Sequence, residues 1–212
     1  MTPWLEQRPA TRFVLTVLAL LPACFVVWHA LSSVLAAPSV MLSNWILLAW
    51  FPGQIVEVGL QGTDMLLVSA FSAEGSGSSS RVAASAMDSI GYLIDTRALS
   101  YSIPFYTALH MATRIRSSLS VYSWNLLLMW VVLAIGLVAT GLKDLLVTEG
   151  SAALNAPGMP PSDAIALTYQ ASSLLAPTLV PAMLWAYAAR RSDLLRTLLP
   201  ESLTSKEGRG DT

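Results

Sequence analysis

The sequence predicts a mainly α-helical, polytopic membrane protein with about four transmembrane helices and a small strand-rich extracytoplasmic insertion after the first. Hydrophobic residues make up 54% of the 212 residues and charged residues only 12%, whereas a soluble domain carries about 25% charged residues. The charges also fall in clusters, and none lies between Phe13 and Val56. This pattern is typical of a chain that alternates between lipid and water.

The first predicted transmembrane helix is 13–37, after a cytoplasmic tail of residues 1–12. A helix needs about 20 apolar residues, at about 1.5 Å per residue, to cross about 30 Å of hydrocarbon. Arg8 and Arg12 precede this stretch, and the sequence LAA at 35–37 resembles a cleavage site, so the alternative is a signal peptide. The apolar run exceeds the roughly 7–15 residues of the hydrophobic region of a signal peptide, which favours an uncleaved anchor.

Residues 38–97 are predicted to form an extracytoplasmic segment. The stretch 39–51 lies between Pro38 and Pro52-Gly53 and is too short to span, so it predicts an interfacial helix. In 54–97, alternating apolar and polar residues, the QGTD turn at 61–64 and a glycine-serine stretch predict a β meander.

Three further transmembrane helices are predicted at 98–113, 117–142 and 164–189, with an extracytoplasmic loop at 143–163 and a cytoplasmic tail at 190–212. The first of these is short, but Arg114 and Arg116 could reach back to the membrane interface. The last contains Pro177 and Pro181, which should kink it.

The distribution of basic residues predicts a bacterial inner-membrane protein with both termini in the cytoplasm. This layout places nine basic residues inside and three outside, as the positive-inside rule requires. A rival layout uses 39–56 as the second span, leaves 98–113 off the membrane, and places eleven inside and one outside. We favour the first layout because its disputed span is longer, Pro52-Gly53 would interrupt the rival span, and 54–97 suits an outward-facing module.

The sequence offers little chemistry. A net charge of −1 gives no basic footprint for nucleic acid, and the single Cys24 excludes an internal disulfide and multi-cysteine metal motifs. Cys24 and His29 are five residues apart, so they do not share a helix face. The three longest spans hold no charged residue, which argues against ion-coupled transport. Gly136 and Gly141, also five apart, do not form a Gly-x-x-x-Gly packing motif.

We therefore predict no catalytic residue, no cofactor and no metal site. The positions that we single out are expected to contact a partner or to kink a helix; they are Pro104, Tyr106, His110, Asp144, Pro177 and Pro181.

Three stretches carry a family resemblance: ALSYSIPFYTAL at 98–109, GLKDLL at 141–146, and APTLVP at 176–181 followed by Trp185. Their order resembles that of the exosortase H-associated membrane proteins, which accompany a membrane protein-sorting transpeptidase in Gram-negative bacteria. The sequence SYS at 100–102 is less glycine-rich than the family pattern. The chain does not resemble the exosortase itself, a cysteine transpeptidase with Cys, Arg and His around helix ends, since Cys24 lies in mid-span.

The leading functional hypothesis is a noncatalytic accessory or scaffold protein of an envelope protein-sorting system. Its expected partners are membrane lipid and a membrane protein, which the resemblance implies is an exosortase. One alternative is a structural component of a secretion or conjugation apparatus. Another is a membrane enzyme or transporter subunit that acts through His110 or the 143–163 loop.

Overall fold

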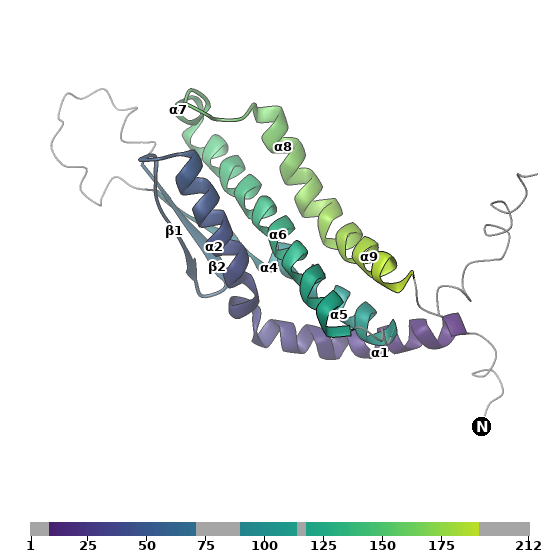
Figure 1. The fold of residues 1–212 in the computed structure, drawn as a ribbon. Helices are drawn as coiled ribbons and strands as arrows, with labels where there is room; N and C mark the ends of the chain where they lie inside the picture. The colour runs from purple at the N-terminus through teal and green to yellow at the C-terminus, as the bar shows by residue number, and fades with distance from the viewer. Residues whose placement is uncertain (1–8, 71–89, 114–117, 191–212) are drawn as a thin grey trace, which may run out of the picture.

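A computed structural model describes residues 9–70, 90–113 and 118–190 of the chain (Figure 1). The predicted tails before residue 9 and after residue 190, and the glycine-serine stretch at 74–80, lie outside the described residues. The elements in chain order are α1 (Pro9–Ala30), α2 (Ser32–Trp50), β1 (Ile55–Gln61), β2 (Asp64–Ser69), β3 (Ile90–Asp95), α4 (Arg97–Ser100), α5 (Ser102–Thr113), α6 (Ser118–Glu149), α7 (Ser151–Leu154), α8 (Ser162–Gln170), the π-helix η2 (Ala171–Leu175) and α9 (Ala176–Ala189).

Four helical stretches of the described chain are long and apolar enough to cross a membrane. They are Ala10–Ala30, Ser32–Trp50, Leu119–Glu149 and Ser162–Ala189. Large apolar side chains remain exposed along all four, including Val26, Met41, Leu119 and Leu174, each about 70% exposed or more. Exposed apolar surface on this scale is costly in water and is expected where lipid surrounds the helices.

The first two helices differ from their predicted bounds. The first ends at Ala30 rather than at residue 37, and α2 begins at Ser32 and has 19 residues instead of the 13 of the predicted interfacial helix. Pro38, which was expected to separate them, lies inside α2. A proline at this position removes the N–H that would bond the carbonyl four residues earlier, here that of Val34. The next carbonyl, that of Leu35, accepts from the Trp130 indole of α6 at 3.0 Å, which ties this part of α2 to α6. The strand-rich insertion therefore follows the second helix, not the first.

The later helices also depart from the predicted bounds. The predicted span 98–113 is divided at Tyr101 into α4 and α5, and Pro104 lies in the first turn of α5, where proline is tolerated. The predicted span 117–142 continues to Glu149 as α6, a helix of 32 residues and about 48 Å. The predicted span 164–189 corresponds to α8, η2 and α9, which follow one another without a break.

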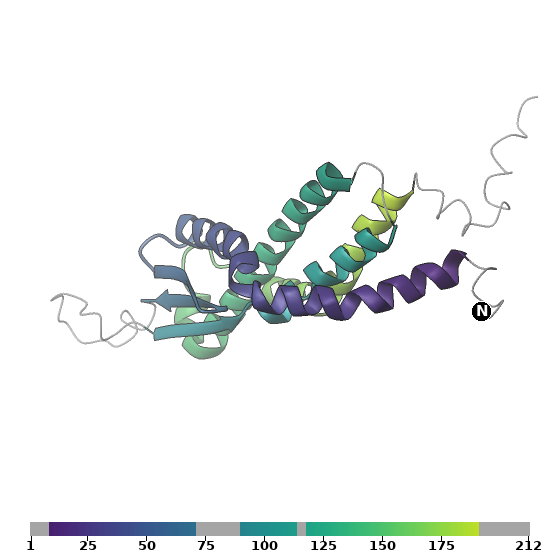
Figure 2. The same ribbon diagram turned by 90° about the horizontal axis from the view of Figure 1, so that it is seen from below.

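Figures 1 and 2 show an elongated arrangement with two distinct ends. At one end, which we call the terminal end, α1 and α6 begin and α5 and α9 stop. At the other, the sheet end, lie the sheet, α7 and the start of α8. The α5 helix packs between α1 and α9, and α2 packs against α6 and β1. Because α2 bends away from α1 instead of folding back along it, the sheet lies far from the start of α1 (Figure 1).

The insertion is a three-stranded antiparallel meander in the order β1-β2-β3. Gly62 adopts a positive φ of 65° in the turn between β1 and β2, a conformation that glycine reaches at little cost. The register pairs Met65 with Leu60 and Ile94, and β1 bulges between Ile55 and Glu57.

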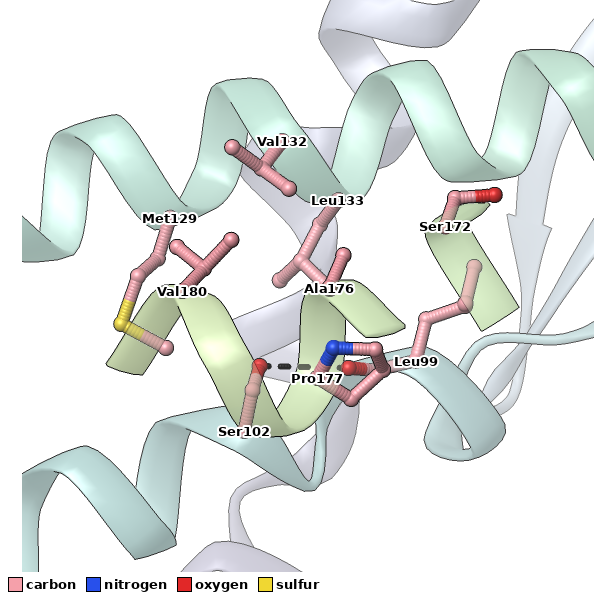
Figure 3. A pocket seen from close by; sticks show the side chains of 9 residues that line it. All are labelled: Leu99, Ser102, Met129, Val132, Leu133, Ser172, Ala176, Pro177 and Val180. Carbon is pink, nitrogen blue, oxygen red and sulfur yellow. Dashed lines mark hydrogen bonds between the residues drawn. The ribbon is translucent and has the colours of Figure 1, made fainter. Parts of the chain in front are cut away.

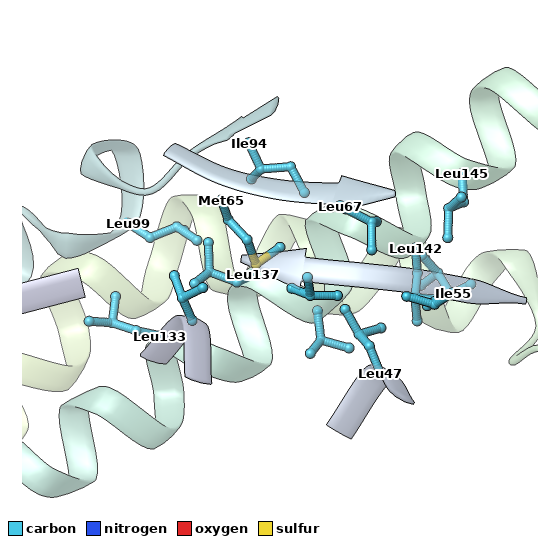
Figure 4. Close-up of a cluster of buried hydrophobic side chains, with 14 of the residues drawn as sticks. Leu47, Ile55, Met65, Leu67, Ile94, Leu99, Leu133, Leu137, Leu142 and Leu145 are labelled. Carbon is cyan, nitrogen blue, oxygen red and sulfur yellow. The ribbon is translucent and has the colours of Figure 1, made fainter. Parts of the chain in front are cut away.

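One face of the sheet forms a shared core with α2 and α6 (Figure 4). Met65 and Leu67 are fully buried there against Leu47 of α2 and Leu137 of α6. At Gly141 of α6, an added Cβ atom would lie 3.1 Å from Leu67 Cδ2. The absence of a side chain at Gly141 therefore lets the sheet approach α6 closely.

Candidate functional site

A cluster of polar aromatic and amide side chains lies between α5 and α6, with buried members on α5 and half-buried members on α6. Asn125 Nδ2 donates to the Tyr106 hydroxyl at 2.6 Å, and that hydroxyl lies 3.3 Å from His110 Nδ1. Tyr106 is fully buried and His110 is 4% exposed. The spacing of four residues places Tyr106 and His110 on one face of α5, so the cluster follows from helical geometry together with one amide from α6.

Ring packing holds the same cluster together. The rings of Tyr106 and Tyr122 stack with centroids 5.7 Å apart, and His110 lies 5.3 Å from Tyr122. Thr107 Oγ1 is 3.0 Å from the Tyr122 hydroxyl. We call Tyr106, Thr107, His110, Tyr122 and Asn125 the polar cluster. Its hydroxyl and amide groups are partnered within the protein, as burial in an apolar environment requires.

Next to the polar cluster, an aromatic contact ties three helices together at the terminal end. The Trp185 indole of α9 donates to Thr113 Oγ1 of α5 at 2.6 Å. Its ring stacks on Phe13 of α1, with centroids 5.3 Å apart and planes inclined by 16°. The tryptophan therefore fixes the start of α1 and the end of α5 against α9.

The first proline of the last helix, Pro177, lies near the start of α5. Both Pro177 and Pro181 are buried. Pro177 borders a cavity of only about 10 Å³ with Leu99, Ser102 and Met129 (Figure 3). That space is at the lower limit for a single water molecule. The π-helix Ala171–Leu175 ends two residues before Pro177, and Pro181 lies inside α9; their role as kink positions stays a prediction.

Asp144 lies elsewhere, on the sheet-end half of α6. Its carboxylate forms an ion pair with Lys143 Nζ at 2.7 Å, and the Lys143 ammonium lies 4.7 Å from the centre of the Tyr169 ring. Both side chains are about one-third exposed. A partly exposed ion pair of this kind contributes little to stability. Asp144 therefore contacts α8 indirectly, through Lys143.

An apolar groove of about 340 Å³ lies between α2, α6 and α8. Its floor is formed by Val138, Ala139 and Leu142 of α6, and its walls include Trp50 and Ile165. The volume reaches the lower part of the range of ligand pockets, about 300–1,000 Å³. The lining includes no charged side chain, so the groove suits hydrocarbon or an apolar side chain and offers no reactive group.

The described residues include no group of three or more His, Cys, Asp and Glu side chains that could hold a metal ion. Cys24 and His29 both lie on α1, and the His29 ring packs edge-on against Trp28, with centroids 6.5 Å apart. His110, the other histidine, lies in the polar cluster with hydroxyl and amide neighbours.

Of the six singled-out positions, the structure brings Tyr106 and His110 together and separates Asp144 from them. Tyr122, Asn125 and Trp185 complete the contacts at this end but were not singled out. Asn125 is the only amide side chain in the stretch 117–142, so a search for amides in apolar spans would have found it.

Comparisons with known proteins agree with the membrane fold. A family model described as exosortase H-associated membrane protein matches residues 7–192. This match covers most of the chain, which belongs to that family and is a multi-pass membrane protein. The predicted fold class and the family resemblance are confirmed. No curated protein matches the chain, and no solved structure matches it.

Proposed function

We propose that the protein is a noncatalytic accessory subunit that binds an exosortase in the bacterial inner membrane and supports protein sorting there. The observation that carries this proposal is the family match over residues 7–192, because it includes the whole described membrane architecture. The family description itself states an association with an exosortase.

The polar cluster supports a structural role more than a reactive one. Its Tyr106 hydroxyl accepts from Asn125 and faces His110, and Thr107 meets Tyr122. A general base needs a substrate proton within hydrogen-bond reach, whereas Tyr106 and His110 are almost completely enclosed. The cluster therefore suits a device that fixes α5 against α6.

We further propose that the terminal end faces the cytoplasm and the sheet end faces outward. By sequence, Arg8, Arg12, Arg114, Arg116 and Arg190 flank the helix ends that meet at the terminal end, in agreement with the positive-inside rule. The position of the sheet supports this layout over the rival, because the rival would place the sheet on the same side as the start of α1 (Figure 1).

Co-purification tests the accessory role. The full chain, carrying an affinity tag, is isolated in mild detergent from membranes that also contain the exosortase of the same organism. Recovery of a stoichiometric complex is expected, and a chain that elutes alone as a monomer under all mild conditions would contradict the proposal.

Thiol labelling tests the orientation. In a Cys24→Ser background, one variant carries Gln61→Cys in the exposed turn of the sheet, and a matched variant carries Ser205→Cys in the C-terminal tail. A membrane-impermeant reagent should label the first variant in intact cells and the second only after the cells are broken. The opposite result would place the sheet in the cytoplasm.

A membrane enzyme or transporter subunit is the second candidate, because His110 is a titratable side chain buried among apolar helices and such residues often serve a function. Complementation of a deletion strain with His110→Ala and Asp144→Ala separates the two. Full function of both variants would exclude this candidate.

A further inference from the structure

The outward face of the sheet forms a regular grid of three cross-strand rows. Strand pairing places Gln61 beside Asp64 and Asp95 in the first row. The second row contains Gly59, Leu66 and Leu93, and the third contains Glu57, Val68 and Gly91. Residues that pair across an antiparallel sheet lie on the same face, and this face is opposite to the one that Met65, Leu67 and Ile94 bury against α2 and α6.

The middle of this face is apolar. Leu93 is 60% exposed, and Leu66 is half-buried beside it. An added Cβ atom at Gly91 would lie 3.4 Å from Leu66 Cδ1, so Leu66 reaches toward this glycine. A sheet packed on one side usually has polar residues on the other. The apolar pair Leu66 and Leu93 therefore departs from the pattern of a solvent-facing sheet.

Carboxylates border the apolar centre at both ends. Asp64 and Asp95 are direct partners across β2 and β3, and Glu57 lies at the opposite row of β1. Like charges directly opposite each other destabilise a sheet. Each aspartate makes only a local contact: Thr63 Oγ1 donates to Asp64 at 3.3 Å, and the Arg97 backbone N–H donates to Asp95 at 2.8 Å. None of the nine residues in the three rows is basic.

The combination of apolar centre and acidic border selects among occupants. Anionic lipid headgroups would be repelled by the three carboxylates. A second copy would also be disfavoured, because a two-fold interface would bring the same acidic face against itself. A Lys or Arg side chain between Asp64 and Asp95 would instead relieve their repulsion and form charge-assisted hydrogen bonds.

We propose that this sheet face docks a segment of the membrane-protein partner that presents apolar side chains flanked by Lys or Arg. The inference rests on the proposed function, since the partner tested is the exosortase. Leu66 and Leu93 receive the apolar side chains, and Asp64, Asp95 and Glu57 receive the basic ones.

Photo-crosslinking tests the proposal on the full chain in membranes that contain the exosortase of the same organism. The crosslinker p-benzoylphenylalanine replaces Leu93, and in a matched control it replaces Val147, which is 78% exposed on α6. We expect Leu93 to cross-link to an exosortase peptide that contains Lys or Arg, and Val147 to give little product.

Charge removal gives two readouts of opposite sign. The double variant Asp64→Asn with Asp95→Asn should stabilise the isolated chain against unfolding, because it removes the opposed carboxylates. It should also lower the cross-linking yield about tenfold, as expected when a charged interface contact is lost. A loss of yield together with a loss of chain stability would indicate a folding defect and overturn the proposal.

Three results distinguish the possible failures. If the exosortase co-purifies but Leu93 does not cross-link to it, the docking face is wrong and the accessory role stands. If Leu93 cross-links to residues 71–89 of its own chain or to a second copy, the proposed occupant is wrong. If the exosortase does not co-purify at all, the proposed function and the docking partner fail together.

Discussion

The hydrogen bond between Asn125 and Tyr106 allows a quantitative test of the polar cluster. The variant Tyr106→Phe keeps the ring and its stacking on Tyr122, 5.7 Å away, but removes the hydroxyl that accepts from Asn125 at 2.6 Å. The variant Asn125→Leu keeps the approximate side-chain size and removes the donor. Combined, the two variants complete a double-mutant cycle, which isolates the energy of the shared contact.

The expected magnitudes follow from burial. Tyr106→Phe removes the acceptor of the half-buried Asn125 amide, which should cost about 0.5–1.5 kcal/mol, the usual net contribution of an intramolecular hydrogen bond. Polar contacts between membrane helices contribute about 0.6 kcal/mol on average and up to about 1.7 kcal/mol. Because Tyr106 is fully buried and the bond is short, we expect a coupling energy toward the upper value, about 1–1.7 kcal/mol.

The assay is reversible unfolding of the purified chain in mixed micelles, with the fraction of denaturing detergent as the variable. Thr16→Val is the matched control, since its hydroxyl makes an exposed bond within α1 to the Arg12 carbonyl. This control should change stability by less than about 0.5 kcal/mol. If the effects of Tyr106→Phe and Asn125→Leu add within about 0.3 kcal/mol, the contact does not stabilise the fold and the assignment is refuted.

Three further predictions use the same unfolding assay. Gly136→Ala should be at least about 1 kcal/mol less stable than Gly141→Ala. The Cβ atom added at Gly136 would lie 3.2 Å from Ser172 Cβ, next to the η2 backbone, whereas the Cβ atom added at Gly141 would meet flexible methyl groups. Equal stabilities of the two variants would contradict this prediction. Trp185→Phe should lower the free energy of unfolding by about 0.6–1.7 kcal/mol, because it loses the hydrogen bond to Thr113. The control Trp124→Phe, at a 70% exposed position, should leave stability nearly unchanged. Similar losses of stability in both variants would count against a role of Trp185 in holding α1, α5 and α9 together. Burial, followed by the hydrogen bond to Glu149, raises the pKa of the Tyr92 hydroxyl above its ordinary value of 10.0. Below pH 10 the free energy of unfolding of the wild type should therefore exceed that of Tyr92→Phe by about 1 kcal/mol, and this difference should disappear as the pH rises through the pKa of the folded state. A difference in stability that persists at high pH would rule this out.

The charge pattern predicted the helical stretches well because it depends only on composition. The gap in charge from Phe13 to Val56 does correspond to helix over most of its length, but the pattern did not locate the break at Leu31. Pro38 predicted a boundary, whereas in the structure it lies inside α2. The nearby Leu35 carbonyl accepts a hydrogen bond from Trp130 of α6, 95 residues later in the chain. A neighbouring helix that supplies a hydrogen bond cannot be identified from local sequence.

The glycines of α6 show a similar limit. Gly136 and Gly141 fail the Gly-x-x-x-Gly pattern because five residues turn a helix by about 500°, which places them on different faces. In the structure each serves a different neighbour: Gly136 meets Leu99 and Ser172, and Gly141 meets Leu67 and Ile94. The pattern tests whether two glycines share one contact, so it does not detect two glycines that each make a separate one.

Two helix breaks and the π-helix η2 lie close together in the structure. Trp28, near the end of α1, donates to Ser100 at the end of α4, which places the α1–α2 break beside the α4–α5 break. Gly136 of α6 contacts Leu99 of α4 and Ser172 of η2. Because α6 itself is continuous over 32 residues, one helix carries both Asn125 of the polar cluster and Leu137 of the core that it shares with the sheet. A side chain added at Gly136, between these two positions, would press on α4 and η2 at once.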